Sequence, residues 1–149
     1  MKITLTLLFG AILMSTATAQ IKYGWEKALP ATSFEDAVTR VTELLKEEGF
    51  GVLTEIDVKT TMKKKLDLDF RKYVILGACN PPLAARALQA EPQIGLMLPC
   101  NVVVQEDENN GSIVSIIDPK AMFLFIENDG LKPVAAEAEE KLQRVLNKL

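Results

Sequence analysis

The stretch YVILGACNPP, residues 73 to 82, decides how this chain folds. Its first seven residues form a continuous apolar run with β-branched and aromatic members, which predicts a central strand buried on both faces of a sheet. Asn80 is a good N-cap, and Pro81 suits the first helical position because its missing N–H is not needed there. The strand therefore passes directly into a helix, and Cys79 lies at the junction.

Alternating strands and helices are expected on the N-terminal side of this junction. The patterns predict a first strand over residues 21 to 28 and a helix capped by Ser33 and ended by Gly49. Period-two alternation predicts a strand from Phe50 to Val58, and residues 60 to 66 read as a short helix. Each helix follows a strand after only a few residues.

On the C-terminal side, a hairpin is the strongest signal. Residues 101 to 106 and 112 to 117 alternate and flank Asn110-Gly111, a dipeptide typical of hairpin turns. A short helical turn is expected to run through Phe123, and a last amphipathic helix to follow Gly130. The element order predicts a single compact α+β domain with helices packed on a mostly antiparallel sheet.

The first 19 residues have the three regions of a secretory signal peptide. Lys2 precedes an apolar run, and a small-residue stretch ends in Ala17-Thr18-Ala19. We therefore expect cleavage after Ala19, one α+β domain over residues 20 to 149, and a periplasmic or secreted protein. The apolar run is too short to span a bilayer, so no stable membrane insertion is expected after cleavage.

Composition narrows the classes of function. The 149 residues carry a formal net charge of −3, which argues against a nucleic-acid partner held by bulk charge. The chain has no histidine, so it lacks the commonest general base and the usual zinc or copper ligand. No glycine-rich phosphate loop or serine triad pattern is present, and no cofactor is expected.

The two cysteines, Cys79 and Cys100, are the main candidates for chemistry. Parallel pairing of their strands would place them at opposite ends of the sheet, whereas antiparallel pairing, which we favour, could bring them to the Cα separation that a disulfide requires. Three interpretations remain open. The first is a structural disulfide, the default in an exported chain; the second is a redox-active thiol pair beside a helix N-terminus; the third is a soft-metal site for Cu(I) with Met97 as a weak third ligand.

Acidic side chains form a second set of candidates. Glu55 and Asp57 share one face of a predicted strand, and Asp118 could line the same cleft. Paired carboxylates can perform acid–base chemistry if burial separates their pKa values. The simpler interpretation is that the first two face solvent and that Asp118 caps the turn beginning at Pro119.

Five motifs make the chain similar to a known family. They are Ser33–Ala37, Gly49–Asp57, Leu76–Pro81, Pro92–Val102 and Ile117–Pro119. With them the chain resembles the family called domain of unknown function 302, from about Tyr23 to the final helix. The resemblance implies a small single α+β domain and no established activity.

One departure from the family pattern concerns metal binding. Members often have histidine where this chain has Ala85, between Ala84 and Arg86. The resemblance therefore implies that this chain lacks the one histidine that would have joined the cysteines as a ligand, which lowers the weight of a metal or proton-transfer role.

A binding role is favoured over catalysis. The lead hypothesis is a non-enzymatic domain that binds a small molecule or a protein partner at a concave site formed by two Cys-Asn segments and an acidic face: Cys79, Asn80, Cys100, Asn101, Glu55 and Asp57, with Asp118 as a further candidate. The alternative is thiol redox or soft-metal binding through Cys79 and Cys100. A homodimer formed through surface hydrophobic residues is a third possibility.

Overall fold

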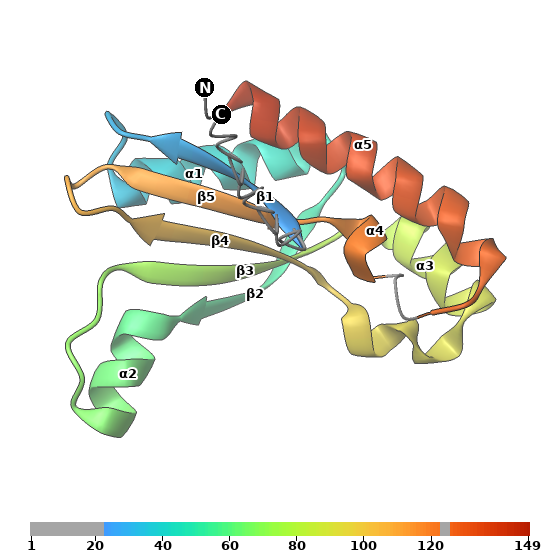
Figure 1. Cartoon of the computed structure of the whole chain (residues 1–149), viewed down its shortest axis with the longest axis horizontal. Helices are drawn as coiled ribbons and strands as arrows, with labels where there is room; N and C mark the ends of the chain where they lie inside the picture. Colours follow the sequence, from blue (N-terminus) through green and yellow to red (C-terminus); the bar gives the residue numbers. More distant parts are fainter. Residues whose placement is uncertain (1–22, 123–125) are drawn as a thin grey trace, which may run out of the picture.

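Five strands pair into one sheet in the order β1-β5-β4-β3-β2, and every neighbouring pair is antiparallel. The computed structural model describes residues 23 to 122 and 126 to 149 (Figure 1). The predicted α+β class and the single domain with helices on an antiparallel sheet are confirmed. The predicted signal peptide and Phe123 lie outside the described residues.

The strands are β1 (Gly24–Leu29), β2 (Gly51–Asp57), β3 (Tyr73–Cys79), β4 (Cys100–Glu106) and β5 (Ser112–Ile117). The α-helices are α1 (Phe34–Glu47), α2 (Val58–Leu66), α3 (Pro81–Ala90), α4 (Pro119–Met122) and α5 (Lys132–Lys148). Among the described residues, the 3₁₀ helices are η1 (Pro92–Met97) and η3 (Asp129–Leu131). The predicted elements are all present, whereas neither 3₁₀ helix was expected from the sequence.

The helices α1 and α5 pack together over β4 and β5 on one face of the sheet (Figure 1). The prediction that β3 is buried on both faces is therefore wrong. Val74, Leu76 and Ala78 point to the helices and are at most 3% exposed, whereas Tyr73 and Ile75 on the other face are only partly buried. A continuous apolar run in the sequence does not distinguish a strand that is buried on both faces from one that is buried on a single face. The open face of such a strand is still partly covered by its neighbours in the sheet.

The buried core consists of side chains from the helix-facing rows of the strands and from the inner faces of α1 and α5. Its largest fully buried members include Leu45, Leu76, Val102, Ile116 and Leu142. Burying a side chain of this size contributes about 1.5 to 3 kcal/mol. The core therefore fixes the sheet against α1 and α5, and through them the positions of the strand ends.

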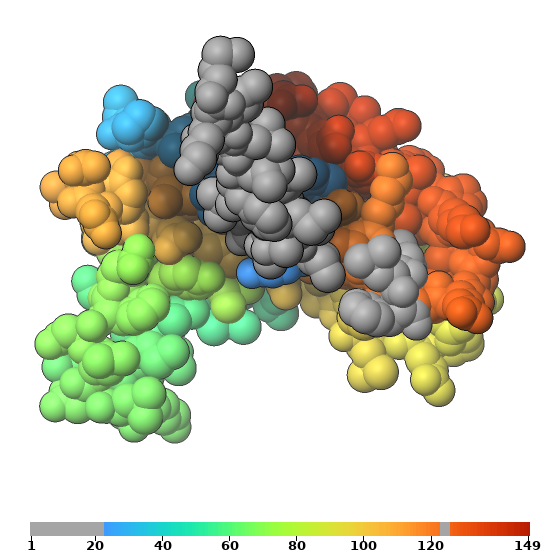
Figure 2. Space-filling view, viewed as in Figure 1, coloured from blue at the N-terminus to red at the C-terminus, as the bar shows by residue number. Residues whose placement is uncertain are grey.

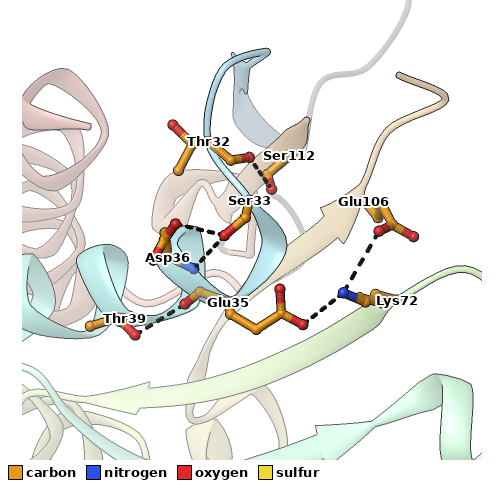
Figure 3. A network of polar contacts seen from close by, with 8 residues as sticks. All are labelled: Thr32, Ser33, Glu35, Asp36, Thr39, Lys72, Glu106 and Ser112. Carbon is orange, nitrogen blue, oxygen red and sulfur yellow. Dashed lines mark hydrogen bonds and ion pairs between the residues drawn. The ribbon is translucent and has the colours of Figure 1, made fainter. Parts of the chain in front are cut away.

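At one end of the sheet, where α1 begins, exposed polar contacts hold the elements together (Figure 3). Ser33 Oγ accepts a hydrogen bond from the backbone N–H of Asp36 at 3.2 Å and so caps α1, as its sequence position predicts. Lys72 Nζ lies 2.7 Å from Glu35 and 3.9 Å from Glu106. We call this region, with these five residues, the polar end of the sheet.

The helix α2 stands away from the body of the protein, at the lower left in Figure 2. None of its residues is buried, and Asp57 caps it, so the strand β2 ends one residue earlier than expected. Lys63 pairs with Asp67 at 2.7 Å and with Asp69 at 3.2 Å. The lysines of this helix therefore form a solvated face, partly neutralised by the acidic residues that follow.

The β4–β5 hairpin forms as predicted. Asn110 has a positive φ of 62°, which its small polar side chain tolerates, and Asp107 Oδ1 accepts the N–H of Gly111 at 2.7 Å. Within the described residues, no helix combines the length and the apolar character needed to cross a membrane.

Candidate functional site

Cys79 and Cys100 meet at the end of the sheet opposite the polar end. The strands β3 and β4 are antiparallel, as favoured from the sequence, and their register places Ala78 directly opposite Cys100. Cys79 is the next residue along, so its Cα lies roughly 6 Å from that of Cys100 by the geometry of an antiparallel pair. The fold therefore brings together two cysteines that are 21 positions apart in the sequence.

The expected structural disulfide is not present, because both cysteines are free. Ala78, not Cys79, is the cross-strand partner of Cys100. Consecutive side chains on a strand point to opposite faces, so the diagonal neighbour does not face Cys100 as a directly opposed residue would. A separation of Cα atoms that suits a disulfide is thus insufficient without the matching direction of the Cβ atoms.

Both cysteines line a small cavity of ≈ 40 Å³ between this end of the sheet, α3, α4 and α5. Most of the described lining is apolar and includes Phe50, Leu83, Ala87, Ile94, Val134 and Ala138. Asn80 also lines the cavity, and no charged side chain does so among the described residues. We call this cavity the sulfur pocket, after Cys79, Cys100 and Met122, the three sulfur-containing residues among its described lining.

The two thiols differ in burial. Cys100 is 7% exposed, and burial, with a smaller contribution from the neighbouring Cys79, raises its pKa from 9.0 to about 11. Its thiol therefore stays protonated at neutral pH. Cys79 is only partly buried. A thiolate on Cys100, which thiol–disulfide exchange requires, is disfavoured by this environment.

Asn80 has a structural role that the sequence predicted. Its Oδ1 accepts the backbone N–H of Leu83 at 3.2 Å, and so it caps α3. Its Nδ2 donates to the carbonyl of Glu48 at 3.4 Å, which ties α3 to the end of α1. With Pro81 and Pro82 at the first two helical positions, the start of α3 has no free N–H to offer there. An anionic ligand therefore gains little at this helix terminus, contrary to the expectation that its N–H groups would favour a thiolate.

Four other predicted site residues do not line the sulfur pocket: Glu55, Asp57, Asn101 and Asp118. The register of β2 with β3 places Glu55 opposite Leu76 and Asp57 at the far end of the strand, away from Cys79. The acidic face and the Cys-Asn segments are therefore not one concave site, which corrects that part of the expectation.

These residues have simpler local roles. The hydroxyl and the backbone N–H of Thr60 hydrogen-bond the Asp57 carboxylate and lower its pKa. Asp118 Oδ1 accepts the N–H of Lys120 at 2.8 Å at the start of α4, as the capping interpretation predicted. Glu55 and Asn101 are exposed. Two of the four thus act as helix caps.

Met97, the predicted third sulfur ligand, is 38% exposed and lies outside the sulfur pocket. Met122 in α4 is the methionine of the described lining, and it is 9% exposed. The spacing of Pro119 and Met122 in the sequence is the signal for this burial. Residues at positions i and i+3 lie on the same face of a helix, and both of these are buried. The described residues contain no group of three or more His, Cys, Asp or Glu side chains suited to a metal ion.

Comparison with known proteins assigns the chain to a family. The family model described as Domain of unknown function DUF302 matches residues 25 to 149. The chain belongs to the DUF302 family. It is also similar to a crystal structure of an uncharacterized conserved DUF302 protein from Bacillus stearothermophilus, with a TM-score of 0.78 and 31% identity over 85% of this chain and 98% of that chain. No curated protein matches it.

The family motifs can now be placed in this DUF302 domain. Leu76–Pro81 and Pro92–Val102 both contribute residues to the sulfur pocket. Ala85, where members often have histidine, is exposed on α3 and does not line the cavity. Its identity therefore removes no ligand from the sulfur pocket, contrary to the inference drawn from the sequence.

Proposed function

We propose that this DUF302 protein is a non-enzymatic binding protein whose ligand occupies the sulfur pocket. The observation that carries the proposal is a cavity whose described lining is mostly apolar and includes both free cysteines, placed where several elements converge. The predicted acidic residues lie elsewhere, so the binding role is assigned here to Cys79, Asn80 and Cys100 alone.

The described lining supports binding over catalysis. It contains no carboxylate, lysine or arginine, and the chain has no histidine, so no ordinary proton donor or acceptor faces the cavity at neutral pH. Asn80 already uses its carbonyl oxygen on Leu83 and its amide group on Glu48. The bound group is therefore uncharged, or it is one that sulfur attracts.

The size of the cavity limits what it holds. A single water molecule requires a cavity volume of roughly 10 to 15 Å³. A cavity of ≈ 40 Å³ therefore accommodates a group of only a few heavy atoms. A ligand larger than this would have to extend out of the cavity or displace part of its lining.

Export from the cytoplasm remains a prediction. The N-terminal sequence of the protein purified from its own cells tests it.

Xenon is a suitable probe of the cavity, because it enters small apolar cavities without requiring hydrogen bonds. We expect saturable xenon-induced chemical shift changes for the residues that line the sulfur pocket, measured in amide and methyl spectra. Ala84→Leu should abolish them, because Ala84 lines the cavity. Ala85→Leu is the matched control, since this residue lies one position further along the same helix and is exposed.

Both variants should first be shown to unfold cooperatively, so that a loss of binding is not a loss of structure. The proposal fails if the wild-type protein shows no saturable change. It fails equally if Ala84→Leu, folded as the wild type is, responds to xenon as Ala85→Leu does.

A further inference from the structure

The strand β2 is an edge of the sheet, and its outer side pairs with no strand of the described residues. Natural proteins often protect such an edge with lysine or proline. β2 contains neither, and all of its residues except Val52 are exposed. The register with β3 shifts between Val52 and Thr54, but from Thr54 to Asp57 the pairing is regular. The outer side of this regular part is therefore open to another strand.

A basic lobe lies where β2 ends. It consists of α2 and the loop after it, residues 58 to 71. It holds five basic and two acidic side chains, so its net charge is +3. Both acidic side chains pair with Lys63. The basic residues of the lobe that make no ion pair with the described part of the chain are Lys59, Lys64, Lys65 and Arg71.

An acidic lobe lies at the other end of β2, and it consists of residues 88 to 99 and 126 to 131. Asn128 Nδ2 donates to the last carbonyl of α3 at 2.9 Å, which joins the two parts. Gly51 at the start of β2 pairs with Cys79, and the lobe leads directly into the start of β4 at this same end of the sheet. The outline of the molecule is hollowed between the two lobes (Figure 2).

The acidic lobe holds three carboxylates and no basic side chain. Asp129 pairs with Lys132, which directly follows the lobe, at 2.6 Å. Glu91 and Glu127 make no ion pair with the residues that the structure describes. The two ends of β2 therefore carry opposite charges that remain available to a partner.

Exposed apolar side chains gather on these same three regions. Among the described residues, eight large apolar side chains are exposed, and all but Tyr23 lie on β2 or on one of the lobes. The seven are Leu53 and Ile56 on β2, Leu66 and Leu68 on the basic lobe, and Leu88, Leu96 and Met97 on the acidic lobe. Apolar surface concentrated in this way marks an interaction site.

We propose that this protein forms a two-fold symmetric dimer through β2. In the dimer, β2 pairs antiparallel with β2 of a second copy, and the basic lobe of each copy packs against the acidic lobe of the other. Antiparallel pairing of a strand with its own copy places the end of each strand beside the start of the other. One symmetry operation therefore joins the open edges and brings the opposite charges together.

A second copy suits this surface better than an unrelated partner does. A strand from another protein would pair with the edge alone, and it would have to supply an acidic group at one end and a basic group at the other. This chain supplies both. The homodimer considered from the sequence thus gains a specific surface, and the inference does not depend on what occupies the sulfur pocket.

Sedimentation equilibrium tests the dimer, with the protein and its variants produced in its own cells. We expect a reversible monomer–dimer equilibrium between about 0.1 and 100 µM. Raising the salt concentration from about 0.05 to 0.5 M should weaken the dimer roughly tenfold, because salt screens the charges of the lobes.

Leu53→Lys tests the apolar part of the surface. Leu53 is 68% exposed, so the monomer should retain its fold, and cooperative unfolding checks this. Dimerisation should weaken on the order of 30-fold, because a lysine ammonium would be placed beside the paired strands. Tyr23→Lys is the matched control, since it makes the same kind of change at a residue that is 78% exposed and lies outside the proposed interface.

Charge reversal tests the pairing of the lobes. Lys64→Glu and Glu127→Lys should each weaken the dimer about tenfold, and the double variant should recover most of this loss. Lys46→Glu is the control, because Lys46 is exposed on α1, outside both lobes. Its affinity for a second copy should be unchanged.

Hydrogen exchange tests the pairing of the strands themselves. Amides of residues 54 to 57 should exchange more slowly in the wild type at high concentration than in Leu53→Lys. The inference is wrong if the wild type stays monomeric, which would leave this edge to a strand of another protein. Equal affinities of Leu53→Lys and Tyr23→Lys, no recovery in the double variant, or exchange of the β2 amides that is independent of concentration would each overturn it as well.

Discussion

The two ends of the central strand β3 are stabilised in opposite ways. At the polar end, Lys72, Glu35 and Ser33 make contacts in solvent, where water replaces a lost partner (Figure 3). At the end that forms the sulfur pocket, Asn80 and Cys100 are at most 8% exposed and water does not reach them freely. A substitution at the polar end should therefore have little effect, and a comparable one at the sulfur pocket a large effect.

The largest expected effect comes from Gly77→Ala, near the sulfur pocket. A Cβ at this position would clash with Oγ1 of Thr54 and lie 2.7 Å from Cγ of Pro99, so the Thr54 side chain and the Pro99 ring would have to move. We expect a loss of about 3 kcal/mol in the free energy of unfolding, measured with urea. Gly51→Ala is the control, because nothing lies within 4 Å of its Cβ; equal losses in the two variants would refute the close-contact explanation.

The next effect is an alkaline loss of stability that depends on Cys100. In the folded protein the Cys100 thiol keeps its proton up to a pKa of about 11, whereas the unfolded chain releases that proton near 9.0. The contribution of the protonated thiol to stability is therefore fully present below pH 9. As the pH rises towards 11, the free energy of unfolding falls by roughly 2 kcal/mol. Urea unfolding of the wild type and of Cys100→Ala at pH 8 and pH 10.5 measures this loss, and identical pH dependence in both would show that the burial of the thiol does not matter.

The two helix caps compare the ends directly. Asn80→Ala removes a buried cap together with the bond to Glu48, and we expect it to destabilise the protein by about 2 kcal/mol. Ser33→Ala removes an exposed cap of the same kind and should cost about 1 kcal/mol or less. Thermal or urea unfolding of the two variants measures both losses in the free energy of unfolding. A larger loss for Ser33→Ala would reverse the proposed contrast between the ends.

The smallest effect is expected for Lys72→Met at the polar end. The hydrogen bond from Lys72 holds the pKa of the Glu35 carboxyl below its usual value, so this pKa should rise towards normal in the variant. Glu35 supports folding above its unfolded pKa, and this support is lost as the pH falls through the folded pKa. NMR titration of the Glu35 side chain measures the shift, and unfolding at neutral pH should be almost unchanged; an unmoved pKa would show that Lys72 is not its cause.

Local signals predicted most of the fold. Ser33, Asn80-Pro81 and Asn110-Gly111 mark helix starts and a turn through hydrogen bonds and φ angles that depend only on nearby residues. The exposed face of β3 and the end of β2 at Asp57 were missed. In each case neighbouring elements, rather than the segment itself, decide the outcome.

The candidate site was predicted only in part. Cys79, Asn80 and Cys100 could be singled out from the sequence, because cysteine is a rare residue type and because Cys79 ends a strand directly before the helix cap Asn80. All three residues line the sulfur pocket. Met122 was missed in favour of Met97, since closeness in sequence to Cys100 was taken for closeness in space. Long-range packing, which brings α4 over the sheet end, has no local signature.

The sequence by itself therefore determined the elements, their order, the α+β class and the two cysteines as candidates, because periodicity, caps and turns act over a few residues. Only the tertiary structure decided the order of the strands, the free state of both thiols, and the grouping of Cys79, Cys100 and Met122 in one cavity. These depend on strand register and on the direction of side chains from separate elements, which are set when the core packs as a whole.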